Sequence, residues 1–128
     1  MVVGLAAAHA NSILSVYSGT TYTAIAGSYV QLHVGDPGAA GTTSISAGST
    51  TRNQATWNAA SGGSMSKNTL SAWTNGGTSE TLSHVSLWSA VSAGTFIQSF
   101  TLSASQAWVS TNTFTLTTFT LSFTPIAA

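Results

Sequence analysis

The sequence predicts a mainly β protein, an antiparallel β-sandwich or barrel-like domain with one N-terminal α-helix, in which residues 1–128 form a single domain. Three observations favour this fold. Apolar residues recur at helical spacing only near the N-terminus. Beyond Gly19 the apolar residues recur at every second position, which is the period of a β-strand. From about residue 29 to 124, short segments of this kind alternate with turns rich in Gly and Ser.

The helix is expected at about residues 5–17. One apolar stripe runs along it, and several alanines add helix propensity. Ser18-Gly19 is a typical C-terminal stop. The apolar run Val2–Ala8 is short and has no preceding Lys or Arg, so a helix is favoured over a signal peptide. The stripe consists of Leu5, His9, Ile13, Val16 and Tyr17.

The first strand is expected where Val30, Leu32 and Val34 alternate with more polar residues. This pattern predicts one buried face and one solvent-facing face. The strand should end at the turn Gly35-Asp36-Pro37-Gly38, where proline presets one backbone angle and the following glycine accepts a positive φ. A loop rich in Gly, Ser and Thr is expected at 39–51.

Shorter strands are expected after this loop, each bounded by glycine turns. In the strand at 82–88, Ser83, Val85 and Leu87 form the more uniformly aliphatic set and are the predicted core face. In the strand at 95–102, every second residue from Phe96 should share one face. The expected strands are 52–57, 70–73, 82–88, 95–102 and 107–109.

The final apolar segment changes parity, which predicts a bulge or corner near Thr117-Thr118. Its apolar side chains have no Lys or Pro nearby to protect an open strand edge. We therefore expect this segment to be central in its sheet or paired with a neighbouring subunit. The apolar residues are Phe114, Leu116, Phe119, Leu121 and Phe123.

Formal charge is confined to Asp36, Arg52, Lys67 and Glu80, and the net charge is zero. Globular domains usually devote about a quarter of their residues to these four residue types. A surface with so little charge indicates a protein that is docked in an assembly. The balance offers no basic patch for nucleic acid or anionic lipid, and no apolar run reaches the roughly 18 residues of a membrane span. We expect neither partner.

The residues that could carry chemistry do not form a recognisable site. Asp36 and Glu80 are the two carboxylates available for a catalytic pair, and both have local explanations in turns or loops. His9, His33 and His84 are isolated, and the chain lacks cysteine. The sequence therefore predicts no enzyme, no catalytic residues, no metal site and no cofactor.

The tryptophans are the remaining candidates for a functional surface. Core packing accounts for most tryptophans, but four in a small, charge-poor domain is a high number, and tryptophan is a favoured anchor at protein interfaces. The strand containing His84 and Trp88 is the leading candidate for a subunit contact. The interface candidates are His84, Trp88, Trp57, Trp73 and Trp108.

Four segments resemble, in order and spacing, those of a family of small tailed-phage virion proteins, labelled tail-fibre, minor tail or head-decoration proteins. Residues 29–38 are similar to the family's "LYVALHTGDPG", and residues 59–64 to its "AASGGS" turn. Residues 84–90 are similar to the strand "THVGLWDA", and residues 94–97 to "GGTFL". The resemblance covers the chain from about Leu5 to Phe123.

This resemblance implies a bacteriophage virion structural protein, assembled in the cytoplasm of the host bacterium. We favour a capsid decoration or cementing protein on the head exterior, because the chain lacks the heptads or repeats of a fibre shaft. The alternatives are a minor tail or tail-fibre subunit and, in another class, a glycan-binding module for receptor recognition. The expected partners are the major capsid protein or other virion subunits and further copies of the chain, a trimer being one option.

Overall fold

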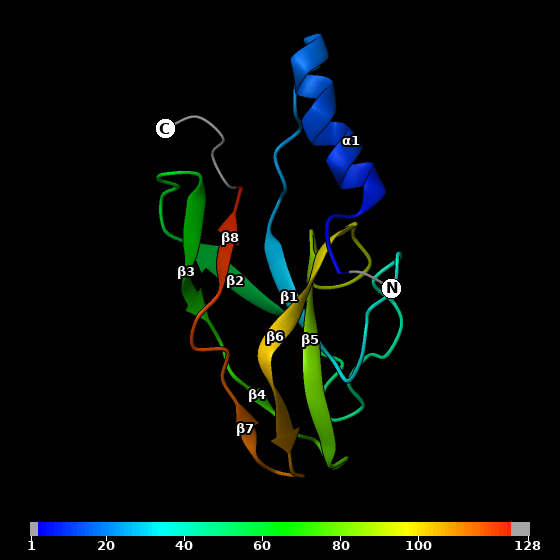
Figure 1. Ribbon diagram of the computed structural model, residues 1–128. Helices are drawn as coiled ribbons and strands as arrows, with labels where there is room; N and C mark the ends of the chain where they lie inside the picture. Colours follow the sequence, from blue (N-terminus) through cyan, green and yellow to red (C-terminus); the bar gives the residue numbers. More distant parts are fainter. Residues whose placement is uncertain (1–2, 124–128) are drawn as a thin grey trace.

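The computed structural model describes residues 3–123 as a six-stranded antiparallel sheet, a two-stranded sheet and one α-helix. Figure 1 shows the helix at one end of the large sheet and the small sheet at the other. The strand order is β6-β5-β1-β2-β3-β8 in the large sheet, and β4 pairs with β7. The predicted mainly β fold with one N-terminal helix is confirmed. The elements are α1 (Ala7–Ser15), the 3-10 turn η1 (Val16–Ser18), β1 (Ser28–His33), β2 (Asn53–Trp57), β3 (Ser64–Leu70), β4 (Trp73–Thr74), β5 (Glu80–Trp88), β6 (Phe96–Trp108), β7 (Thr113–Phe114) and β8 (Thr120–Ser122).

The large sheet curls around the main core, so that its two edges approach each other. Phe100 of β6 meets Phe119, which directly precedes β8, with ring centroids 4.9 Å apart and perpendicular ring planes. A smaller cluster contains Ala6, Trp88 and Phe96. The barrel-like shape therefore comes from one curled sheet. The main core is formed by Val30, Leu32, Ala55, Trp73, Leu82, Val85, Leu87, Ile97, Trp108 and Phe119.

The α-helix is shorter than predicted at both ends, because α1 covers Ala7–Ser15 and the chain continues to the predicted stop as the 3-10 turn η1. α1 begins at Ala7, because residues 4–6 run beside β6 and form a bridge between Leu5 and Gln98. Gly19 ends η1 with φ of 85°, a left-handed conformation that glycine adopts without a side-chain clash. No residue of α1 is buried, so the helix stands beside the sheet without entering its core.

Strand β1 is buried on both faces, whereas the sequence predicts one solvent-facing face. Val30 and Leu32 are fully buried as expected, but Gln31 and His33 are also buried. The loop at 43–50 explains this difference. Backbone carbonyls of that loop accept hydrogen bonds from the side chains of Gln31 and His33, so the loop covers the polar face of the strand.

The turn after β1 has the predicted conformation. Gly38 has φ of 75°, and its N–H donates to the Asp36 side chain at 2.8 Å. Val34, predicted to face the core, lies beyond the last residue of β1 and is 39% exposed. The alternating pattern therefore predicts the strand correctly but extends one residue too far.

Strand β2 agrees with the strand predicted at 52–57, but the strand predicted at 70–73 is wrong. β3 ends at Leu70, and β4 begins at Trp73 in the separate two-stranded sheet. β3 itself contains few apolar residues and was not predicted. It forms because it hydrogen-bonds to β2 on one side and to β8 on the other, and such pairing outweighs a weak local preference.

In strand β5, part of the predicted core face is correct. Val85 and Leu87 are buried in the main core, but Ser83 is half-buried and Leu82 is fully buried in its place. The pairing with β6 shifts register between Leu82 and His84. A shift of this kind changes which face the side chains occupy, and here it brings Leu82 to the core.

Strand β6 joins the two strands predicted at 95–102 and 107–109 into one. Phe100 and Leu102 pack against the main core, as expected for residues on one face. Phe96 belongs instead to the smaller cluster, because the pairing between β5 and β6 shifts again next to Trp88. The prediction of a single shared face from Phe96 onward is therefore wrong.

The final segment breaks where predicted, but its position in the sheet differs. β7 pairs with β4, β8 pairs with β3, and residues 115–119 between them form no strand. Phe119 is buried, whereas Phe123 is 66% exposed, although its parity predicts an inward position. β8 is an edge strand, so the prediction of a central position is wrong. Pairing of this segment with a neighbouring subunit stays a prediction.

Candidate interaction surface

A buried polar network surrounds the His33 side chain. Its Nδ1 lies 2.8 Å from the Thr43 carbonyl oxygen, and its Nε2 lies 2.7 Å from Ser86 Oγ. Trp88 Nε1 donates to the same Ser86 oxygen at 2.8 Å. Because a carbonyl oxygen can only accept, Nδ1 carries the proton and Nε2 accepts the Ser86 hydroxyl hydrogen. In this tautomer the neutral imidazole satisfies both of its ring nitrogens and the Ser86 hydroxyl.

Burial lowers the pKa of His33 below its ordinary value of 6.5. The neighbouring His84 and Arg52 lower this pKa further, while hydrogen bonds to the backbone at Thr43 and Ser44 partly oppose the effect. Protonation at Nε2 would make this nitrogen a donor, so the Ser86 hydroxyl hydrogen would lose the acceptor that Nε2 provides. The network therefore favours the neutral imidazole both by desolvation and by hydrogen-bond direction.

The depressed pKa of His33 predicts that the protein loses stability in mild acid. The unfolded chain binds a proton near pH 6.5, whereas the folded chain binds it at lower pH. This contribution is therefore complete above pH 6.5 and is lost as pH falls through the folded-state pKa of His33. Urea unfolding between about pH 8 and about pH 5 measures it. A His33→Gln variant should show a flatter dependence, and an unchanged slope would exclude His33 as its source.

The half-buried Arg52 side chain is held against the sheet. Its guanidinium carbon lies 3.7 Å from the centre of the Trp88 ring, which is a cation–π contact. Nη1 donates to the carbonyl oxygens of Ala93 at 2.6 Å and Ala90 at 3.3 Å, and Nε donates to Gln31 at 3.2 Å. Burial lowers the pKa of Arg52, but guanidinium remains charged at neutral pH. The side chain fastens the turn between β5 and β6 to the sheet.

Both carboxylates hold loops in place. Glu80, at the start of β5, accepts hydrogen bonds from the Ser46 hydroxyl and from the N–H groups of Ala47 and Gly48, the latter two at 3.1 Å. Asp36 accepts from the backbone of its own turn. The Asp36 contact agrees with the turn role that the sequence predicts, whereas Glu80 lies in β5 and binds a loop that is distant in the chain.

The predicted interface residues lie in different parts of the structure. Trp73 and Trp108 are each 2% exposed in the main core, and Trp88 is 5% exposed in the smaller cluster. Their rings therefore have little area left for another subunit. Trp57 and His84 are half-buried. For all five residues, an interface role stays a prediction.

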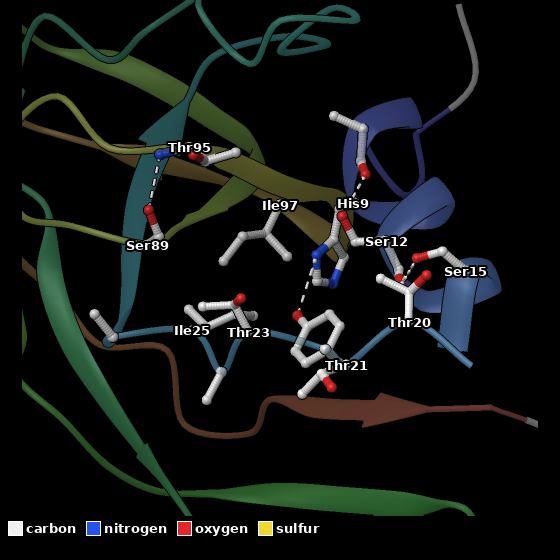
Figure 2. Close-up of a pocket in the computed structure, with 14 residues that line it drawn as sticks. His9, Ser12, Ser15, Thr20, Thr21, Thr23, Ile25, Ser89, Thr95 and Ile97 are labelled. Atoms are coloured by element: carbon white, nitrogen blue, oxygen red, sulfur yellow. Dashed lines mark hydrogen bonds between the residues drawn. The ribbon is translucent and has the colours of Figure 1, made fainter. Parts of the chain in front are cut away.

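One hollow, of about 410 Å³, lies between α1 and the extended segment 20–26. Figure 2 shows hydroxyl groups of Ser12, Ser15 and several threonines around it, with Ile97 of β6 at its base. His9 Nδ1 lies 3.5 Å from the Tyr22 hydroxyl, and burial lowers the pKa of His9. The residues that line this hollow include no Asp, Glu, Lys or Arg, so it is polar without being charged.

A second hollow, of about 380 Å³, lies between α1 and the edge formed by β3 and β8. In contrast to the first, it is lined mainly by apolar side chains from these elements and from segment 20–26. Figure 1 shows α1 and β8 at the same end of the molecule, and both elements contribute residues to the lining of this cleft. The cleft and the exposed tip of the helix together form what we call the helix-end surface. It comprises Ile13, Tyr17, Ile25, Met65, Leu121 and Phe123.

The sequence predicts only part of the helix-end surface. Ile13 and Tyr17 belong to the predicted helical stripe, and the final apolar segment supplies Leu121 and Phe123. The sequence does not predict that Met65 belongs to this surface, because Met65 lies in β3, a strand that the apolar pattern does not predict.

Two further properties bear on function. Within residues 3–123, no group of three His, Asp or Glu side chains lies close enough to hold a metal ion. No helix in this range combines the length and apolar character needed to cross a membrane.

Comparison with known proteins identifies the family. No curated protein matches the chain. A family described as podophage GP4 fiber I protein gp80 matches residues 4–124, which is nearly the whole chain. The match includes α1, the curled sheet and the helix-end surface. The chain therefore belongs to the podophage GP4 fiber I protein gp80 family and is a structural protein of the phage virion.

Proposed function

We propose that the protein is a subunit of a phage tail fibre rather than a decoration protein of the capsid shell. The observation that carries this proposal is the match over residues 4–124 to a family described by a fibre protein. The lack of heptads or repeats would favour a capsid decoration protein only if a fibre subunit had to form the shaft of the fibre. A fibre also contains globular parts that need no such repeats. A curled sheet with an exposed apolar end suits a globular part of a fibre equally well.

The position of the charged groups supports a structural role rather than a catalytic one. Arg52 and Glu80 hold loops against the sheet, and Asp36 stabilises its own turn. The fibre subunit therefore contacts other virion subunits mainly through apolar and hydrogen-bonding groups. It joins the particle during assembly in the cytoplasm of the host bacterium.

The buried tryptophans weigh against the glycan-binding alternative. A glycan platform needs an exposed aromatic ring beside a carboxylate or amide, but Trp73, Trp88 and Trp108 fill the chain's own cores. Glu80, in turn, is occupied by the loop at 46–48.

The location can be tested by immunogold electron microscopy of virions from the phage that encodes the chain. Antibodies raised against the purified protein should label the tail. Antibodies absorbed beforehand with the same protein serve as the control and should give no label. Label spread over the capsid surface would contradict the fibre proposal and support the decoration role.

A further inference from the structure

The N-terminal arm, residues 5–27, is incompletely packed against its own sheet. No residue of α1 is buried, and in segment 20–26 all side chains except the half-buried Tyr22 are exposed. This segment forms no strand in the described structure. Isolated helices shorter than about 12–15 residues are marginal in water, and α1 has nine residues. The arm is therefore stabilised if another surface packs against it.

The apolar stripe of the helix extends beyond the area that its own chain covers. Leu5, His9 and Ile13 are half-buried along the cleft. The same stripe continues to Val16 and Tyr17, which are 47% and 90% exposed. An exposed apolar patch at one end of a small protein marks an interaction site.

The helix-end surface also offers a complementary hollow. The cleft of about 380 Å³ is lined by Ile13, which lies four residues before the exposed Tyr17 on the same stripe, and its other walls include Ile25, Met65 and Leu121. At its rim, Phe123 is 66% exposed. Within the described residues 3–123, strand β8 adds an edge that pairs only with β3. A protruding ring and an apolar cleft on one surface are what self-complementary association requires.

The charge distribution identifies the chemistry of the partner. None of the residues lining the cleft is charged. A charged partner group would lose its water there without meeting an opposite charge, which is costly. The partner surface must therefore be uncharged as well as apolar. A second copy of this chain meets that requirement, and its zero net charge removes repulsion between copies.

We propose that the helix-end surface binds the same surface of a second copy of this chain. The tip of one arm, carrying Tyr17, enters the cleft of the other copy, and the contact is repeated in reverse. This contact buries the exposed part of the helical stripe and covers the edge of β8. It does not depend on a tail location, so its test in solution is independent of the labelling of virions.

Sedimentation velocity of the purified full chain over a range of concentrations tests this contact. The wild type should self-associate, and raised salt should not dissociate it, because the surface is uncharged. Tyr17→Glu and Phe123→Glu should each raise the dissociation constant at least about tenfold, since each places an unpaired charge in the contact. Both residues are largely exposed in the single chain, so circular dichroism should show unchanged folding.

Val109→Glu is the matched control. Val109 is 54% exposed and follows β6 at the opposite end of the sheet. The same charge there should leave the dissociation constant unchanged. A wild type that stays monomeric at every concentration would overturn the proposal. The partner of the cleft would then be a different virion protein. Association that survives both Tyr17→Glu and Phe123→Glu would overturn it too, by placing the contact elsewhere.

Discussion

Replacing Trp108 with alanine should lower the free energy of unfolding by about 3–5 kcal/mol. The ring is 2% exposed in the main core and meets Phe114 edge to face, with centroids 6.4 Å apart. Its Nε1 also donates to the carbonyl oxygen of Asn112 at 2.9 Å. Alanine would leave a cavity and remove this hydrogen bond. Since domains of this size are stable by about 5–15 kcal/mol, the loss would bring the fold close to its limit.

Urea denaturation followed by circular dichroism measures this loss. Val109→Ala is the control, because the neighbouring side chain is 54% exposed and its removal should change stability by no more than about 0.5 kcal/mol. Equal midpoints for Trp108→Ala and the wild type would show that the end of the sheet near β4 and β7 does not belong to the cooperative core.

The second large effect is expected for Ser86→Ala. The Ser86 hydroxyl is fully buried and joins two other side chains, because it donates to His33 and accepts from Trp88. Alanine would leave both nitrogens without this partner, and each buried unsatisfied group costs about 1–3 kcal/mol. The effect of Ser86→Ala should therefore exceed the loss of one ordinary hydrogen bond.

The same denaturation experiment tests this prediction. Ser103→Ala provides the control, because Ser103 is exposed on β6 and makes no contact in this network. We expect the control to unfold like the wild type. If Ser86→Ala does so as well, water must reach the two nitrogens, and the network would not hold His33 neutral.

Local sequence patterns predicted the elements whose neighbours agree with them. Val30 and Leu32 alternate with polar residues, and they do form a strand with a buried apolar face. The turn at Asp36 and Gly38 follows from the backbone preferences of its own residues. The stop at Gly19 was predictable for the same reason. In these places, a few adjacent residues determine the conformation.

The errors occur where partners distant in the chain decide the outcome. The apolar pattern cannot predict that a loop supplies hydrogen bonds to Gln31 and His33, so it predicts an exposed face. It also cannot predict the register shifts between β5 and β6, which bring Leu82 into the core and move Phe96 to another cluster. Period-two reasoning assumes an unbroken strand, and a bulge violates this assumption.

The helix-end surface was partly predictable for a similar reason. The stripe containing Ile13 and Tyr17 is local to the helix and was visible in the sequence. The cleft beside it depends on the pairing of Ser64 in β3 with Ser122 in β8, which lie far apart in the chain. Only the folded sheet shows that an apolar helix tip and an apolar cleft occur at one end of the molecule.

The sparse basic residues also determine how the folded protein resists proteases. Trypsin cleaves after Lys and Arg, and the chain contains one of each. The Arg52 side chain is stacked on Trp88 and bound to backbone carbonyls. Lys67 lies in β3, which is paired on both sides. Cleavage at either bond therefore requires a large part of the sheet to open. For this protein, the rate of tryptic digestion reports global unfolding, and a virion protein so built withstands such proteases for as long as its sheet stays closed.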